Sequence, residues 1–261
     1  MQNKVFALDM AYGRTSARFF GAAIDPRASI LVTVVYLCVL LGVPATHIDI
    51  LLWFALYPII AAPLYGLRYS RILLKSLIIL PLVVLIGVFN PILDKTPVAD
   101  FNGWHITRGW LLFIGVVLRG LLSMQCLLIL IDTMGFVGMV DGMRRLGLPR
   151  FLATQLLMVF RYIKVLIEEG LTMRNAIASR SYGAKHLSIR LWGTLVGQLF
   201  LRSIRRAENV HNAMLARGFT GEMPFYSTSQ TEWHLSSTVY LVSWSAIFVF
   251  LRLFNLSLLF V

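Results

Sequence analysis

The chain has 261 residues, of which 58% are hydrophobic and 14% charged, and its mean hydropathy is +0.76. These values lie outside the range of soluble domains and indicate that much of the surface faces lipid. A net charge of +12 could suit nucleic acid, but on so apolar a chain it more often reflects Lys and Arg retained on the cytoplasmic side of a membrane.

The N-terminal residues 1–27 carry four basic and two acidic side chains and lack the apolar core of a signal peptide. We therefore expect this end to stay uncleaved in the cytoplasm. Apolar stretches long enough for a bilayer follow at residues 30–43, 48–67, 72–89, 110–131 and 238–261. Cys38 and Cys126 lie inside such stretches, which favours packing over disulfide or metal chemistry.

Basic residues are unevenly distributed between the loops. Thirteen of the 24 Lys and Arg residues fall within residues 132–237, while the loops at 43–47 and 90–109 carry few. This bias predicts a cytoplasmic N-terminus and an external C-terminus, and it leaves little reason to expect nucleic-acid binding. We predict three regions: residues 1–131 with the tail and four spans, 132–237 as a cytoplasmic helical region, and 238–261 as the last span.

The region 132–237 is too long and too regular for a simple loop, because its apolar residues recur every three or four positions. One helix is expected from the turn Leu146-Gly147-Leu148-Pro149 to Arg180, and another from about Ile189 to Arg217. A glycine follows each helix, Gly183 or Gly218, as is typical of a C-cap. The predicted fold is an all-α integral membrane protein with about five transmembrane helices and two long cytoplasmic helices.

Each of the two long helices ends near an arginine, Arg180 or Arg217. One interpretation is compensation of the helix dipole, which is common and contributes about 0.3–1 kcal/mol. The other is that both guanidinium groups enter acidic or carbonyl-lined grooves of a cytoplasmic partner, since arginine is frequent at interface hot spots. The spacing alone leaves both interpretations open.

Several motifs resemble one family over most of the chain. They are Ile24-Asp25-Pro26-Arg27, although Ala28-Ser29 stands where Thr-Lys is usual, then Gly147-Leu148-Pro149-Arg150, Phe160-Arg161-Tyr162-Ile163 and Ala213-Met214-Leu215-Ala216-Arg217-Gly218-Phe219. In these motifs the chain resembles the T components of energy-coupling factor transporters, most closely the cobalt and nickel (CbiQ-like) branch.

The resemblance implies a function. The chain would be the non-catalytic membrane subunit of an ABC-type uptake transporter in a prokaryotic plasma membrane, for cobalt or nickel. Two ABC ATPase subunits would use the ATP and dock on the motifs Ser179-Arg180-Ser181 and Ala216-Arg217-Gly218. A separate metal-binding S component, with or without a small accessory membrane subunit, would carry the cargo, so no cofactor or metal is expected on this chain.

Other features of the sequence fit a non-catalytic role. No G-x-x-x-x-G-K-[ST] phosphate loop occurs, and the five histidines lack metal-ligand spacing. Arg119 and Arg252 fall within predicted spans, where a charge is costly; Arg119 is a candidate intramembrane functional residue, with backbone pairing or snorkelling as the alternative. A conventional permease that forms the pore itself remains the alternative function, and an intramembrane enzyme ranks last because no catalytic constellation appears.

Overall fold

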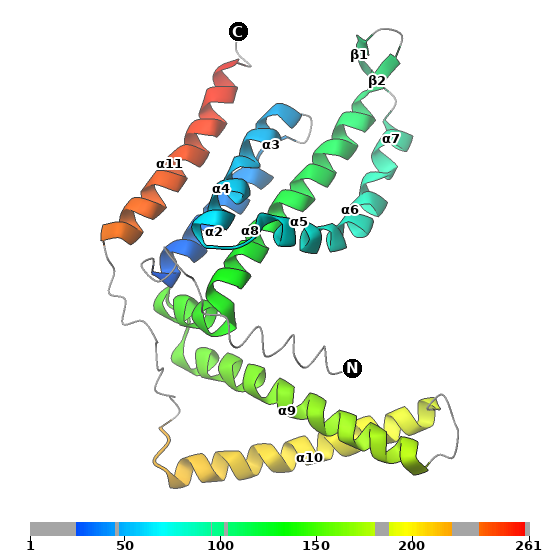
Figure 1. The fold of residues 1–261 in the computed structure, drawn as a ribbon, viewed down its shortest axis with the longest axis vertical. Helices are drawn as coiled ribbons and strands as arrows, with labels where there is room; N and C mark the ends of the chain where they lie inside the picture. Colours follow the sequence, from blue (N-terminus) through cyan, green and yellow to red (C-terminus); the bar gives the residue numbers. More distant parts are fainter. Residues whose placement is uncertain are drawn as a thin grey trace. The chain divides into compact units, whose positions relative to one another are not determined.

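The computed structural model describes residues 25–44, 47–94, 96–101, 104–180, 188–220 and 235–258 (Figure 1). Its elements, in chain order, are α2 (Pro26–Leu41), α3 (Ile48–Phe54), α4 (Leu56–Leu64), α5 (Tyr69–Ser76), the 3-10 turn η1 (Leu77–Ile79), α6 (Leu80–Gly87), α7 (Phe89–Leu93), β1 (Pro97–Phe101), β2 (Trp104–Thr107), α8 (Arg108–Arg145), α9 (Arg150–Arg180), α10 (Ile189–Ala216) and α11 (Leu235–Leu258). The chain divides into two compact units: α9 and α10 form one, and the other elements form the membrane unit.

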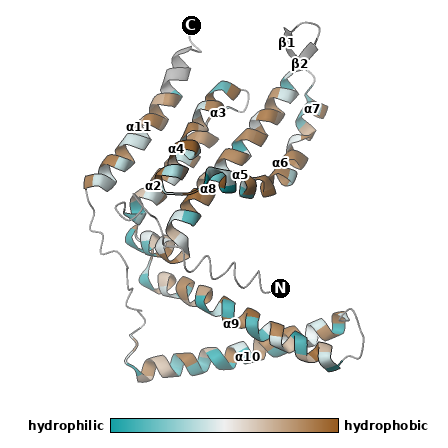
Figure 2. Ribbon diagram, in the orientation of Figure 1, coloured by the Kyte–Doolittle hydropathy of each residue, from teal (hydrophilic) through white to brown (hydrophobic). Residues whose placement is uncertain are grey.

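Five apolar helical segments coincide with the five predicted spans. In the described residues, three are long and apolar enough to cross a membrane, and they are Tyr69–Leu93, Arg108–Arg145 and Leu235–Arg252. Two others, Pro26–Leu41 and Ile48–Leu64, are shorter apolar helices of 10–17 residues. Figure 2 shows the contrast between mostly apolar turns in the membrane unit and mixed turns along α9 and α10. The predicted all-α membrane architecture is confirmed.

One element lies outside that prediction. Strands β1 and β2 pair antiparallel, with Phe101 opposite Trp104, in the segment between α7 and α8. The sequence predicts only a loop between two spans in this segment. The hairpin is small and leaves the helical class of the fold unchanged.

Pro58 accounts for the break in the second apolar segment, where α3 and α4 meet at Ala55. Proline has no N–H, so the carbonyl four residues earlier, that of Phe54, loses its helical donor. The Tyr36 hydroxyl of α2 donates to this carbonyl at 3.1 Å. The helix break is therefore satisfied by a neighbouring helix, as is required where water is excluded.

Aromatic rings from α2, α4 and α11 occupy the centre of the membrane unit. The Tyr36 ring centroid lies 4.8 Å from that of Tyr57 and 5.2 Å from that of Phe248. Trp244 meets Tyr57 edge-on at 4.8 Å. The Tyr36–Phe248 and Tyr57–Trp244 contacts are edge-to-face, a geometry that adds about 0.5–1.5 kcal/mol per pair beyond the burial of area. They fix the last helix beside α2 despite its distance in the sequence.

The helix α8 continues beyond the predicted boundary between residues 131 and 132 and ends at Arg145. Asp132, the first acidic residue after the apolar run, suggested that boundary, but an acidic residue does not end a helix. Instead its carboxylate pairs with Lys75 of α5 at 2.7 Å. The unit containing α9 and α10 begins at Gly147, where the Gly-Leu-Pro turn interrupts the helical backbone.

A kink divides α8 at Gly135, whose backbone has φ 64° and ψ 176°. Only glycine adopts this combination readily, because a Cβ atom would clash with the backbone. We expect Gly135→Ala to destabilise the membrane unit by about 1–3 kcal/mol. Thermal unfolding in detergent would measure this as a lower Tm.

Gly138→Ala is the matched control for the kink. Gly138 has ordinary helical dihedral angles within the same helix, and an added Cβ would meet only Met134 Cβ at 3.4 Å. Alanine should therefore stabilise this position by about 0.5–1 kcal/mol. Equal effects of the two substitutions would show that the kink at Gly135 does not matter to the fold.

Candidate functional site

The helix α9 ends as predicted, at Arg180. Ser179 and Arg180 are exposed, and the Ser179 hydroxyl donates back to the Asn175 carbonyl at 3.0 Å. This local bond satisfies the hydroxyl within its own helix and leaves the arginine accessible. Ser181 and Gly183, which complete the predicted motif and cap, lie outside the described residues.

The helix α10 ends at Ala216, and Arg217 is its C-cap. Gly218 has φ 79°, its N–H bonds the Leu215 carbonyl at 2.9 Å, and the Phe219 N–H bonds the Met214 carbonyl at 3.0 Å. These two bonds form a Schellman motif, which fixes the backbone around the arginine. The predicted cap at Gly218 is confirmed, and Ala216, Arg217 and Gly218 are all exposed.

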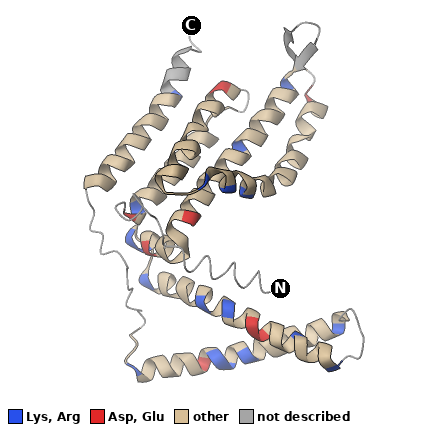
Figure 3. Ribbon diagram, viewed as in Figure 1, with Lys and Arg blue, Asp and Glu red and all other residues tan. Residues whose placement is uncertain are grey.

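The helices α9 and α10 cross, and their C-terminal ends lie on opposite sides of the crossing (Figure 1). Figure 3 shows charged residues distributed along both helices. Glu169 of α9 binds two arginines of α10, Arg202 and Arg206, with N–O distances of 3.3 Å in each pair. Two of the arginines of α10 thus contact α9 in addition to the exposed charges of the helix. Arg180 and Arg217 therefore lie at separate ends of one pair of crossed helices, and the crossing does not bring them together.

Beyond the ion pairs, the two helices diverge and enclose a groove of about 290 Å³. Its lining is mainly apolar and includes Met158 and Leu166 of α9 and Val210 and Met214 of α10. Phe219, which follows the Schellman turn, also contributes. The end of α10 that carries Arg217 is thus continuous with an apolar groove.

We expect Glu169→Lys to loosen the crossing, because it would place three like charges together. The glutamate is 17% exposed and its partners are 58% and 44% exposed, so each pair is worth at most about 1 kcal/mol. The measurable result is a faster amide hydrogen exchange in α9 and α10. Glu168→Lys, at an exposed position on the same helix, is the control and should change exchange little.

Arg119 and Arg252, the two arginines of the predicted spans, both reach the end of α2. The Arg119 Nη2 donates to the Val43 carbonyl, and the Arg252 guanidinium lies 3.1–3.4 Å from the position that a Cβ atom would take on Gly42. The last carbonyls of a helix carry partial negative charge, which cations stabilise. Arg119 thus has the backbone partner that the sequence analysis gave as the alternative to a functional role.

Within the described residues, no group of three or more His, Cys, Asp or Glu side chains lies close enough to hold a metal ion. Glu169, Asp141 and Arg145 are not among the predicted site residues, and the structure places them in ion-pair clusters. The sequence signal for Glu169 is its place in the stretch Val165-Leu166-Ile167-Glu168-Glu169, which resembles the same T-component family.

The comparisons with known proteins agree with these features. Residues 18–226 match the family described as CbiQ, cobalt transport protein. The chain belongs to the CbiQ family. This match confirms, at the level of the family, the resemblance to T components of energy-coupling factor transporters that was inferred from the motifs. The chain is accordingly a membrane protein of a transport family.

Individual relatives are distant. The chain is 27% identical to the energy-coupling factor transporter transmembrane protein EcfT of Bacillus selenitireducens over 190 residues, which cover 67% of this chain and 68% of the relative. It is 29% identical to the nickel permease LarQ of Lactiplantibacillus plantarum over 122 residues, 46% of this chain and 44% of the relative. An uncharacterised protein of Methanocaldococcus jannaschii is 33% identical over 47% of this chain and 45% of its own length. The match spans less than half the length of two of these relatives.

Proposed function

We propose that this chain is the energy-coupling membrane subunit of an uptake transporter for cobalt or nickel. Two ABC ATPase subunits would dock on the ends of α9 and α10 at Arg180 and Arg217, and a separate metal-binding S component in the membrane would carry the cargo. The description of the CbiQ family supports cobalt, and the name of one relative supports nickel. A small accessory membrane subunit is a further candidate partner.

The observation that carries the proposal is the pair of long helices that each end in an exposed arginine. An exposed guanidinium at the end of a rigid helix can enter a groove and donate several hydrogen bonds at fixed angles. The Schellman turn at Gly218 fixes the backbone that presents Arg217. The C-terminal ends of α9 and α10, which carry Arg180 and Arg217, lie on opposite sides of the crossing (Figure 1). Two copies of one partner could therefore each receive one arginine.

Energy would come from the partners. The sequence contains no phosphate-binding loop of the Walker type, so the chain is proposed to bind no cofactor and to hydrolyse no ATP itself. ATP-driven motion of the ATPase subunits would instead move α9 and α10. The charge bias supports a cytoplasmic position for these helices, with the N-terminus inside and the C-terminus outside. The membrane is proposed to be the plasma membrane of a prokaryote.

A conventional permease is the alternative. Such a subunit would form the pore itself and would need polar side chains facing a continuous path through the membrane. The centre of the membrane unit is instead filled by the rings of Tyr36, Phe54 and Phe248, each at most 1% exposed. Packing of this kind favours a scaffold over a channel.

Affinity purification of the chain from its native membrane tests the proposal. We expect two ATPase subunits and at least one further membrane subunit to co-purify, and cobalt or nickel to be bound by that membrane subunit. Reconstituted vesicles should take up the metal only with ATP and all subunits present. Uptake by this chain and the ATPases alone would favour the permease, and a complex without ATPases would contradict both functions.

A further inference from the structure

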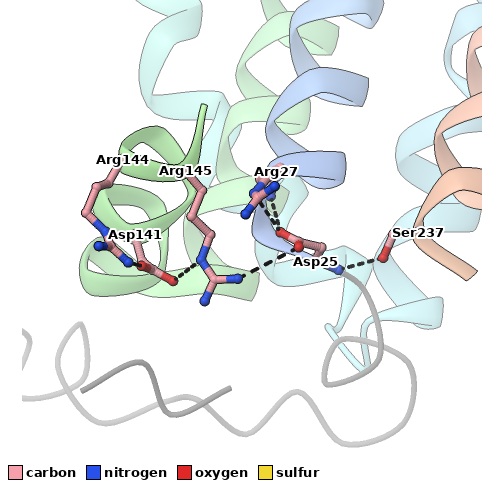
Figure 4. A network of polar contacts seen from close by, with 6 residues as sticks. All are labelled: Asp25, Arg27, Asp141, Arg144, Arg145 and Ser237. Carbon is pink, nitrogen blue, oxygen red and sulfur yellow. Dashed lines mark hydrogen bonds and ion pairs between the residues drawn. The ribbon is translucent and has the colours of Figure 1, made fainter. Parts of the chain in front are cut away.

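The motif around Asp25 forms a polar cluster at one end of the membrane unit (Figure 4). Asp25 is the N-cap of α2, and its Oδ1 accepts a hydrogen bond from the Arg27 N–H at 3.0 Å. Its own N–H donates to the Ser237 hydroxyl of α11 at 2.9 Å. One residue thus joins the first turn of α2 to the first turn of α11.

The same carboxylate faces the end of α8. The Arg145 Nη1 lies 3.9 Å from the Asp25 Oδ2, and the Arg145 Nε lies 2.9 Å from the Asp141 Oδ2. The Arg144 Nη2 binds the other Asp141 oxygen at 3.0 Å. Arg145 therefore lies between two carboxylates, one on its own helix and one on α2.

This cluster is buried to a degree that is unusual for charges. The side chain of Asp25 is fully buried, that of Asp141 is 8% exposed and that of Arg145 is 13% exposed. A buried charge is tolerated only when it is paired. The Arg27 Nε lies 3.9 Å from the Asp25 Oδ1, and Arg145 is the cation beside the other oxygen, so loss of Arg145 would leave the buried Oδ2 without the positive charge beside it. An arrangement of α2 and α8 that keeps Arg145 between the two carboxylates is therefore preferred over neighbouring arrangements.

Backbone packing supports the same arrangement. A Cβ atom on Gly142 would lie 2.7 Å from Ile30 Cδ1 and 3.0 Å from Pro26 Cβ. Only a residue without a side chain allows α8 to approach α2 this closely. Gly142 lies between Asp141 and Arg145. The close backbone contact and the ion pairs therefore hold the same turns of α8 against α2.

The last turns of α8, which contact α2, are also the turns that precede α9 in the chain. The chain passes from Arg145 through the residues Leu146–Pro149 into α9, which begins at Arg150. We propose that Asp25, Asp141 and Arg145 are positioning residues that clamp the end of α8 onto α2, so that motion of α9 and α10 is passed to the membrane helices. The inference rests on the proposed function, and it assigns a mechanical role to a motif that ATPase docking does not use.

Three variants of the complete complex test the clamp: Asp25→Asn, Arg145→Gln and the double variant. We expect the ATPases to remain bound and ATP hydrolysis to stay within about twofold, because the docking ends are unchanged. Metal uptake per ATP should fall roughly tenfold in each single variant, within the ordinary range of coupling free energies. The double variant should be no worse than the singles, because each single already removes the bond between the helices. Unchanged uptake per ATP, or losses that multiply, would contradict the clamp.

Hydrogen exchange of the segment 136–145 gives a readout that does not depend on the cargo. We expect slow exchange in the unaltered complex and faster exchange in Asp25→Asn, with partial recovery of protection in Arg145→Lys relative to Arg145→Gln. Arg71→Gln removes one positive charge from an exposed position of the same unit and should change neither exchange nor uptake.

These measurements separate the clamp from the proposed function. If the unaltered complex takes up no metal, the proposed function fails, while the exchange of the segment 136–145 still decides whether the clamp exists. If exchange is the same in all variants, the clamp fails even where uptake is normal. Variants that do not insert or that form aggregates in detergent would assign the cluster to folding and would also overturn the positioning role.

Discussion

Reversing both docking arginines, as Arg180→Glu with Arg217→Glu, should abolish co-purification of the ATPases and metal uptake while membrane insertion stays normal. Truncation of a charged group that is buried in an interface costs about 2–5 kcal/mol, and each tenfold in affinity corresponds to about 1.4 kcal/mol. Two reversals should therefore weaken the complex by about three powers of ten or more. Co-purification from detergent, followed by cobalt uptake into vesicles, measures both effects.

The control for this prediction reverses the same number of positive charges at two other positions. Arg190→Glu with Arg205→Glu alters two exposed arginines of α10 that lie before its last turns. This variant should keep its ATPases, since neither arginine belongs to a helix end proposed to dock. If both double variants lose the ATPases equally, general charge rather than the two helix ends attracts the partners.

Substitution by lysine separates docking from dipole compensation at the same positions. Arg180→Lys with Arg217→Lys keeps both positive charges and therefore any favourable interaction with the helix dipoles. It removes the planar fork of donors that a groove would recognise. Weakened assembly with unchanged helix stability would support docking, and unchanged assembly would leave only the dipole interpretation.

The two long helices were predictable because their limits depend on local signals. Proline at 149 and glycine at 218 mark positions where a helix must begin or can end, and the structure places α9 and α10 between them with the expected bounds. The spacing of Gly193 and Gly197 would allow two helix backbones to approach closely, but an added Cβ at either position would meet no described atom within 4 Å. A local pattern predicts a cap better than it predicts a contact.

The features that sequence reasoning missed depend on contacts between distant segments. The bond from Asp25 to Ser237 joins residues 212 positions apart, and nothing near either residue predicts it. The hairpin was a different kind of omission, because the Asn102-Gly103 dipeptide is a typical hairpin signal in the sequence itself. The change in polarity after residue 131 predicts the end of the apolar span, and α8 continues past it to Arg145 because a change in polarity does not end a helix.

Arg119→Met should lower the stability of the membrane unit and reduce uptake only in proportion to the folded protein that remains. Position 119 lies eleven residues after the start of α8 at Arg108, or about 16 Å along the helix axis. Its bond to the Val43 carbonyl is a hydrogen bond from a charged group, and such bonds contribute about 1.5–3 kcal/mol. Methionine fills similar space without a donor, so the carbonyl of the buried residue Val43, which follows the C-cap of α2, loses its partner.

Stability and uptake must be measured on the same preparations, because they distinguish the two roles of Arg119. A structural role predicts a lower Tm and normal uptake per folded molecule, whereas a functional role predicts the reverse. Arg252→Met is the comparison: that side chain is exposed and should matter less on its own. Because both guanidinium groups act on the carbonyl end of one helix, the double variant should cost more than the sum of the singles, as each arginine partly covers the loss of the other.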